Sequence, residues 1–211
     1  MIRAILFDVD GTLLDTTEYI YQAFEHSLAL HGLDKVSRGE MSHSIGKPLD
    51  DCYRDYSLLN DVEHLMDSHK EFQLQNPTLS FPFKNSLSTL MALKSNNILI
   101  AAITTRAKVS ALQTLKSSKL YGMLDFFVAR EDVKNLKPDP EPLYKALDFL
   151  GLDADEAIMV GDSPDDVLAG KNAGTKTVGV TYGFHGDRII DCDPDFVIDD
   201  IGEIIQVVGS W

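Results

Sequence analysis

The sequence predicts an α/β fold, a doubly wound parallel sheet that carries an inserted helical subdomain. Short apolar runs alternate with longer amphipathic stretches along the chain, as strands and helices do in such sheets. One interval between apolar runs is much longer than a crossover needs, which indicates the insert. The 211 residues, of which 44% are hydrophobic, are enough to bury a full core and to hold both parts.

Four short apolar runs rich in strand-forming residues end abruptly at polar or glycine residues, which is typical of buried parallel strands. These expected strands are residues 3–7, 98–103, 157–160 and 177–180. The amphipathic stretches beside them predict helices at residues 107–117, 141–150 and 164–173. Ligands of such sheets bind outside the carboxyl ends of the strands, so the residues that follow each strand form the candidate site.

The long interval separates the first expected strand from the strand at residues 98–103. Its amphipathic stretches predict helices at residues 16–31, 48–58 and 61–75. Gly32 is the expected stop of the first of these helices. We therefore expect a helical subdomain at residues 16–80, inserted into an α/β core of residues 1–15 and 81–211.

Charge and cysteine content limit the partners and the compartment. The chain has 19 Lys and Arg against 33 Asp and Glu, a formal charge of −14, and no basic cluster of the kind that binds nucleic acid. Cys52 and Cys192 match neither a zinc spacing nor a disulfide framework, which favours a reducing compartment. The first apolar run stops at Asp8, too early for a signal peptide or a membrane span. We expect a soluble cytoplasmic protein, a monomer or homodimer, without nucleic-acid or membrane partners.

The first expected strand is followed by the acidic motif DVDGT at residues 8–12. In extended geometry Asp8 and Asp10 point the same way, so two carboxylates share one pocket and repel each other. A hard divalent ion such as magnesium, which prefers oxygen ligands, relieves that repulsion best. Taken alone, the motif fits an ordinary acidic turn equally well. A calcium loop of the EF-hand type is excluded, because Thr12 and Leu13 stand where a ligand and a glycine are required.

A second acidic motif, GDSPDD, follows the strand expected at residues 157–160. If this strand lies beside the first one, Asp162 comes within reach of the first acidic motif and completes the same metal site. Asp165 and Asp166 follow Pro164, and acids in the first turn of a helix also stabilise its dipole. We prefer that capping role for Asp165 and the metal-site role for Asp162.

Two further positions offer groups to an anion. Thr104, with Thr105 and Arg106 behind it, ends another expected strand and presents a hydroxyl and free backbone N–H groups, although a simple helix cap has the same pattern. Lys137 is followed by three prolines at alternate positions, which stiffen the backbone beyond it. A fixed ammonium balances the charge of carboxylates and a phosphate; a surface salt bridge is the alternative for this lysine.

Together, the four motifs occur in the order and spacing of the haloacid dehalogenase superfamily, and this resemblance spans the whole chain. The motifs are DVDGT at residues 8–12, ITT at 103–105, Lys137-Pro138 and GDSPDD at 161–166. The resemblance implies a Rossmann-like core. The expected helical insert and residues 161–183 are similar to the cap and the core of the phosphoglycolate phosphatase and pyrophosphatase branch. Dehalogenase members lack the second acid of the first motif, so Asp10 argues for phosphoryl transfer.

The resemblance also implies roles for individual residues. Asp8 attacks phosphorus, while Asp10 protonates the leaving oxygen and then deprotonates the hydrolytic water. Asp8, the backbone carbonyl of Asp10 and Asp162 hold Mg²⁺, and Asp166 supports this shell. The phosphate is held by Thr104 and Lys137. The substrate-binding residues are Gly11, Thr12, Thr105, Arg106, Gly46 and Lys47.

Specificity rests on fewer signals. The loop at residues 44–49 resembles the family's substrate loop, in which Lys47 reads a carboxylate or a second phosphate, or is simply solvated. Arg106 stands where relatives often carry lysine, and it either reaches an anionic substrate or covers the surface. The turn at residues 81–85 lacks the glycine that family members often have where the cap rejoins the core. His185 has no assigned role beyond that of a loop residue.

The expected function is therefore a phosphatase of small anionic phosphate esters, with phosphoglycolate as the leading substrate. Inorganic pyrophosphate is the close alternative, and a sugar-phosphate phosphomutase is the third. A receiver module also uses a phosphoaccepting aspartate, a hydroxyl residue and a lysine, but it has no large helical insert and no need of Asp10. A binding protein with an inactive site is disfavoured, because every expected catalytic position is occupied.

Overall fold

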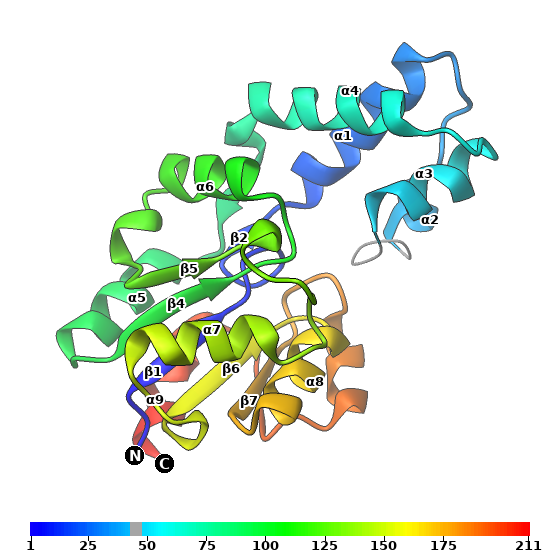
Figure 1. Ribbon diagram of the computed structural model, residues 1–211. Coiled ribbons are helices and arrows are strands. Elements are labelled where there is room, and N and C mark those ends of the chain that lie inside the picture. The colour runs from blue at the N-terminus through cyan, green and yellow to red at the C-terminus, as the bar shows by residue number, and fades with distance from the viewer. Residues whose placement is uncertain (43–47) are drawn as a thin grey trace. The chain divides into compact units, whose positions relative to one another are not determined.

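The computed structural model describes residues 1–42 and 48–211 (Figure 1). The chain divides into two compact units, a larger one of residues 1–15 and 81–211 and a smaller one of residues 16–80. Each unit is described by itself. In the described residues, no helix combines the length and the apolar character that crossing a bilayer requires.

The larger unit is built on a six-stranded parallel sheet with the strand order β5-β4-β1-β6-β7-β8. Its strands are β1 (Ala4–Phe7), β4 (Leu99–Ile103), β5 (Phe126–Val128), β6 (Ala157–Gly161), β7 (Lys176–Val180) and β8 (Phe196–Ile198). The sheet confirms the expected α/β fold class, and all four expected strands are present. The edge strands β5 and β8 were not expected, because three residues are too few to carry a periodic signal.

Helices cover both faces of this sheet (Figure 1). They are α5 (Ser86–Ser95), α6 (Lys108–Ser117), α7 (Glu141–Leu150), α8 (Pro164–Ala173) and α9 (Ile204–Gly209). Side chains of β1 alternate between the two faces, so Ile5 and Phe7 pack in a core that includes α5 and α9 residues. Ala4 and Leu6 pack in a second core with residues of α7 and α8. The central strand is therefore buried on both sides, as its uninterrupted apolar sequence predicts.

The smaller unit is helical. It consists of α1 (Thr17–Leu30), α2 (Arg38–Ser42), α3 (Leu49–Ser57), α4 (Glu63–Gln75) and the short 3-10 helix η1 (Pro77–Leu79). Its core contains Phe24 and Leu28 of α1, Tyr53 of α3 and Leu65 of α4. Gly32 follows the first helix with φ of +69°, a left-handed conformation that glycine adopts without steric cost.

The residues just before and just after residues 16–80 both belong to the larger unit. There β2 (Leu14–Asp15) pairs antiparallel with β3 (Phe81–Pro82). After β3 the chain turns at Asn85, which has φ of +69°. Asparagine tolerates the left-handed region better than most residues, so this turn forms without a glycine. The remaining 3-10 helices are η2 (Tyr121–Met123), η3 (Arg130–Asp132), η4 (Ala154–Glu156), η5 (Gly186–Cys192) and η6 (Ile201–Glu203).

Candidate metal and phosphate site

Two neighbouring strands bring the acidic motifs together. β1 pairs with β6 in parallel, with Phe7 opposite Val160, and the N–H of Asp8 donates to the carbonyl of Val160 over 2.8 Å. Asp8 and Asp162 therefore leave adjacent strands at the same edge of the sheet. Both are almost completely buried, with exposed fractions of 7% and 2%.

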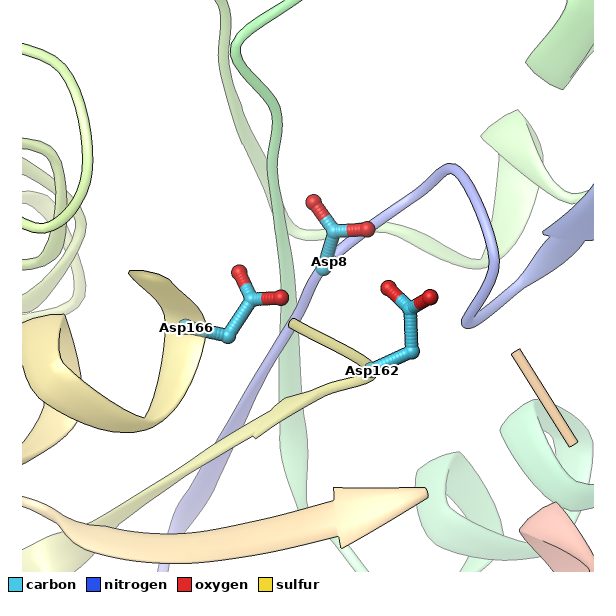
Figure 2. Close-up of side chains that lie close together, drawn as sticks. All are labelled: Asp8, Asp162 and Asp166. Carbon is cyan, nitrogen blue, oxygen red and sulfur yellow. The ribbon is translucent and has the colours of Figure 1, made fainter. Parts of the chain in front are cut away.

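Asp166, in the first turn of α8, joins these two residues. One carboxylate oxygen of each of Asp8, Asp162 and Asp166 lies within 4.8 Å of the others, and all three residues are buried. Figure 2 shows the three side chains converging from β1, from the end of β6 and from α8. The donor set consists of oxygen atoms only, which suits a hard divalent cation such as Mg²⁺.

Lys137 closes this cluster from another side. Its Nζ donates to Asp8 Oδ1 over 2.6 Å, to Asp166 Oδ1 over 2.5 Å and to the carbonyl of Ile103 over 3.1 Å. Only 3% of the lysine side chain is exposed. Three carboxylates and one ammonium leave a formal charge of −2 in a buried place, which a single divalent cation would neutralise.

The ionisation of this cluster reflects the same excess of negative charge. Burial, with Asp166 and Asp10 nearby, raises the pKa of Asp8 from its ordinary value of 3.8 to about 7, although Lys137 opposes the rise. Burial, followed by the charges of Asp8 and Asp166, raises the pKa of Asp162 well above its ordinary range. Burial alone would lower the pKa of Lys137, but Asp166 and Asp8 raise it overall. The lysine therefore stays charged, while Asp8 and Asp162 resist ionisation until a further cation binds.

Asp166 serves the cluster and the helix at the same time. Its Oδ2 accepts hydrogen bonds from the N–H and the hydroxyl of Ser163, which closes a capping box at the start of α8, while its Oδ1 faces Lys137. The hydrogen bonds of the helix cap thus fix the Asp166 carboxylate, which in turn accepts a hydrogen bond from Lys137. Asp165 lies outside the carboxylate cluster, and the capping box at this helix start is made by Asp166, so the capping role preferred for Asp165 stays a prediction.

Asp10 lies beside the cluster but its carboxylate does not belong to it. Asp10 Oδ1 accepts a hydrogen bond of 2.7 Å from Nη1 of Arg106, and the two side chains are 16% and 15% exposed. Arg106 is thus brought to the acidic motif rather than spread over the surface.

The hydroxyl residues differ in their surroundings. Thr104 is buried, and its Oγ1 accepts a hydrogen bond of 3.1 Å from the N–H of Arg106. This bond holds the turn after β4, and α6 begins only at Lys108, so Thr104 is not the cap of that helix. Thr105, the next residue along the chain, is exposed. Thr12 is fully buried, and its Oγ1 has no hydrogen-bond partner in the part of the chain that the structure describes.

Of the remaining site residues expected from the sequence, the structure describes some and not others. Gly46 and Lys47 lie outside the described residues. Gly11 has φ of +87° and lies so close to Asp162 that a Cβ there would be 2.4 Å from Oδ2 of that aspartate. Sequence reasoning missed Phe184, whose backbone N–H donates to the same Oδ2 over 2.6 Å. No side-chain pattern could reveal a backbone donor; the only sequence signal was the neighbouring glycine after β7.

The chain is similar to known proteins over most of its length. Residues 5–180 match the family model described as haloacid dehalogenase-like hydrolase. The chain is 35% identical over 209 residues to the pyrophosphatase PpaX of Halalkalibacterium halodurans, covering 99% of this chain and 97% of that protein. It is 34% identical over 211 residues to the PpaX of a Bacillus cereus strain, with the same coverage.

The fold has close counterparts among solved structures. One is the crystal structure of a protein from Haemophilus somnus described as a predicted phosphoglycolate phosphatase, with a TM-score of 0.90. The match covers 98% of this chain and 97% of that one at 23% sequence identity. At that identity the likeness shows a shared fold and carries no statement about substrate.

Proposed function

This chain belongs to the haloacid dehalogenase-like hydrolases, and we propose that it is a magnesium-dependent phosphatase that works through an aspartyl-phosphate on Asp8. The observation that carries the proposal is the buried cluster of three carboxylates around Asp8 with a formal charge of −2. Folding such a cluster without a further cation is costly, so a site of this kind is best explained by a bound divalent ion.

In the proposed reaction, a carboxylate oxygen of Asp8 attacks the phosphorus atom as the bond between phosphorus and the leaving oxygen breaks. Asp10 donates its proton to that leaving oxygen. Asp10 then accepts a proton from water, whose oxygen attacks the phosphorus of the aspartyl-phosphate and releases free Asp8 and inorganic phosphate. Mg²⁺, when bound, would neutralise charge on the transferred phosphoryl oxygens and on Asp8.

The other residues have supporting roles in this proposal. Lys137 offers an ammonium beside Asp8, which favours the approach of an anionic phosphoryl group to a carboxylate. Arg106 holds the Asp10 carboxylate, and the positive charge of its guanidinium is proposed to attract a substrate anion. Thr104, Thr105, Gly11 and Thr12 surround the same end of the sheet and are proposed to bind the phosphate.

For the substrate, the sequence alone placed phosphoglycolate ahead of inorganic pyrophosphate. The curated relatives at 34–35% identity are named pyrophosphatases and align over nearly the whole chain, which favours inorganic pyrophosphate. Phosphoglycolate is the second candidate, supported by the motifs of the insert and of residues 161–183. A sugar-phosphate phosphomutase is third, because it shares the acidic core but retains the phosphoryl group.

The test combines a substrate panel with metal exchange. The chain, with Mg²⁺, is assayed for released phosphate on pyrophosphate, phosphoglycolate, sugar phosphates and an aryl phosphate, and substrates are ranked by kcat/KM. Chelation should remove activity, and Ca²⁺ should restore little of it because its looser coordination misplaces an in-line attack. Label from ³²P-pyrophosphate should be trapped on the acid-quenched chain at Asp8. Activity that survives chelation would contradict the metal site, and a phosphorylated protein without phosphate release would indicate a receiver module.

A further inference from the structure

The loop that follows β7 reaches across to the second acidic motif. It includes Gly183 and Phe184, which the proposed chemistry does not use. The N–H of Phe184 donates to Asp162 Oδ2 over 2.6 Å, and Asp162 itself is 2% exposed. A hydrogen bond from a backbone N–H to a buried carboxylate is charge-assisted, so it fixes the orientation of the carboxyl group strongly.

Two glycines make room for this contact. A Cβ at Gly183 would lie 2.3 Å from Asp162 Cβ, 2.5 Å from its Oδ2 and 2.4 Å from the carbonyl oxygen of Gly11. A Cβ at Gly11 would lie 2.4 Å from the same Oδ2. Real Cβ atoms do not approach so closely, so both backbones touch the aspartate only because they carry no side chain. One oxygen of Asp162 is enclosed by two loops and bound by one amide.

The loop is also attached to the first acidic motif. The hydroxyl of Tyr182 donates to the carbonyl of Thr12 over 3.1 Å, and the ring of Tyr182 packs edge-on against Phe83 with centroids 4.7 Å apart. The loop therefore keeps a fixed distance from the strand end that carries Asp8. The loop thus contacts the chain at both acidic motifs, at Thr12 through Tyr182 and at Asp162 through Phe184.

We infer that Gly183 and Phe184 are positioning residues for the metal site. The Phe184 amide holds Oδ2 of Asp162, and Gly183 allows that amide to approach, so that Oδ1 is presented to the divalent ion. The inference rests on the proposed function, since it assumes that Asp162 binds the metal. Hydrogen-bond partners of metal ligands commonly change metal affinity by about 10 to 100-fold when they are removed.

The sharpest experiment removes only the N–H. The hydroxy-acid counterpart of phenylalanine is incorporated at Phe184, which replaces its amide by an ester and adds no atoms to the loop. Mg²⁺ affinity is measured by calorimetry on the full chain, and thermal unfolding is measured without metal. The dissociation constant should rise about tenfold or more. Gly183→Ala should weaken binding at least as much, because its methyl group displaces Asp162.

Two controls match these changes. The same ester at Phe149, in α7, removes one backbone donor at an exposed helix position that belongs to neither acidic motif. Gly122→Ala adds a methyl group where no atom lies within 4 Å. Both controls should leave the dissociation constant within about twofold of the unmodified chain.

The outcomes separate this inference from the function on which it rests. If the unmodified chain binds Mg²⁺ and the ester at Phe184 binds it equally well, the positioning role is wrong and the proposed function stands. If both esters weaken binding to the same extent, the loss is general and the positioning role is again wrong. If the unmodified chain binds no Mg²⁺, the proposed function fails, and the positioning role fails with it.

Discussion

The two compact units differ in whether they bury charged side chains. The larger unit buries charged groups beside its neutral ones: Asp8, Asp162 and Asp166 surround Lys137. Among the described residues of the smaller unit, no aspartate, glutamate, lysine or arginine is buried, and some of the buried neutral groups bond to one another, as the hydroxyls of Ser27 and Ser68 do over 2.9 Å. The difference separates polar burial that serves a site from polar burial that only completes a core.

The energetics support that separation. Neutral hydrogen-bonded pairs contribute about 0.5 to 1.5 kcal/mol each and are compatible with ordinary packing. A buried group of ions rarely stabilises a protein more than apolar residues of the same size would. Three acids with one lysine are therefore difficult to explain by stability alone, whereas the buried side chains of the smaller unit need no ligand to explain them.

The largest effect is expected from Asp8→Asn. The amide keeps the shape of the carboxylate but is no nucleophile, so turnover should fall by about 10³-fold or more while the fold is retained. Phosphate release and circular dichroism check the two halves of this prediction. Activity within tenfold of the unmodified chain would show that the buried charge does not serve the reaction in the way we propose.

Asp10→Asn tests whether the Asp10 carboxylate transfers protons and does not bind the metal. General acid–base steps supply about 10² to 10⁴-fold, so a substrate with a poor leaving group should lose at least 100-fold in kcat. Mg²⁺ affinity should change much less than for Asp162→Asn, because the Asp10 carboxylate pairs with Arg106 and not with the cluster. Calorimetry beside kinetics tests both parts. Unchanged turnover would exclude Asp10 as the proton carrier.

Lys137→Met tests the cost of the buried charge directly. Without the ammonium, Asp8 and Asp166 are left unpaired in the interior, which should lower the free energy of unfolding by about 3 to 5 kcal/mol without metal. The matched control is Lys171→Met, whose pair with Asp193 is exposed and should contribute less than about 1 kcal/mol. Denaturant titration gives both values. Equal losses would mean that Lys137 behaves as a surface residue.

The pH dependence of stability gives a smaller effect with a definite sign. Because the pKa of Asp8 is raised from 3.8 to about 7, the folded chain holds a proton that the unfolded chain loses between those values. Stability of the metal-free chain should therefore fall as pH rises from about 4 to about 7, and Mg²⁺ should raise the melting temperature more at about pH 8 than at about pH 5. Asp8→Asn lacks this proton, so its profile should be flatter. Equal slopes in the two proteins would contradict the assigned cause.

How far the sequence predicts this molecule depends on the kind of interaction. Buried central strands have apolar runs that end abruptly at polar or glycine residues, so β1, β4, β6 and β7 were predictable from the residues alone. The convergence of Asp8 with Asp162 was predictable too, because parallel neighbours end at one edge of a sheet. The edge strand β8 has only three residues, of which two are exposed, and its pairing is decided by tertiary contacts.

Contacts that depend on the path of the backbone were not predictable. The pairing of Arg106 with Asp10 joins residues 96 positions apart, and the sequence offered either a substrate contact or a surface position for this arginine. The amide of Phe184 is common to every residue type, so no side-chain pattern marks it. The left-handed turn at Asn85 shows the same limit, because the sequence showed only that residues 81–85 contain no glycine.

The smallest predicted effect belongs to the smaller unit. Tyr53→Phe removes the hydrogen bond of 2.9 Å between its hydroxyl and His69 Nδ1, both of which are buried, and it leaves the ring packing unchanged. The free energy of unfolding should fall by about 1 kcal/mol, because one buried hydrogen bond is lost, while kcat and KM change less than twofold. Tyr144→Phe is the control, since that hydroxyl lies on an exposed residue and should contribute nothing measurable. Denaturant titrations give the free energy of unfolding of both variants, and steady-state kinetics give their kcat and KM. A large loss of turnover in Tyr53→Phe without a matching loss of stability would show that buried neutral groups also serve the reaction, and the contrast between the two units would then no longer separate site from core.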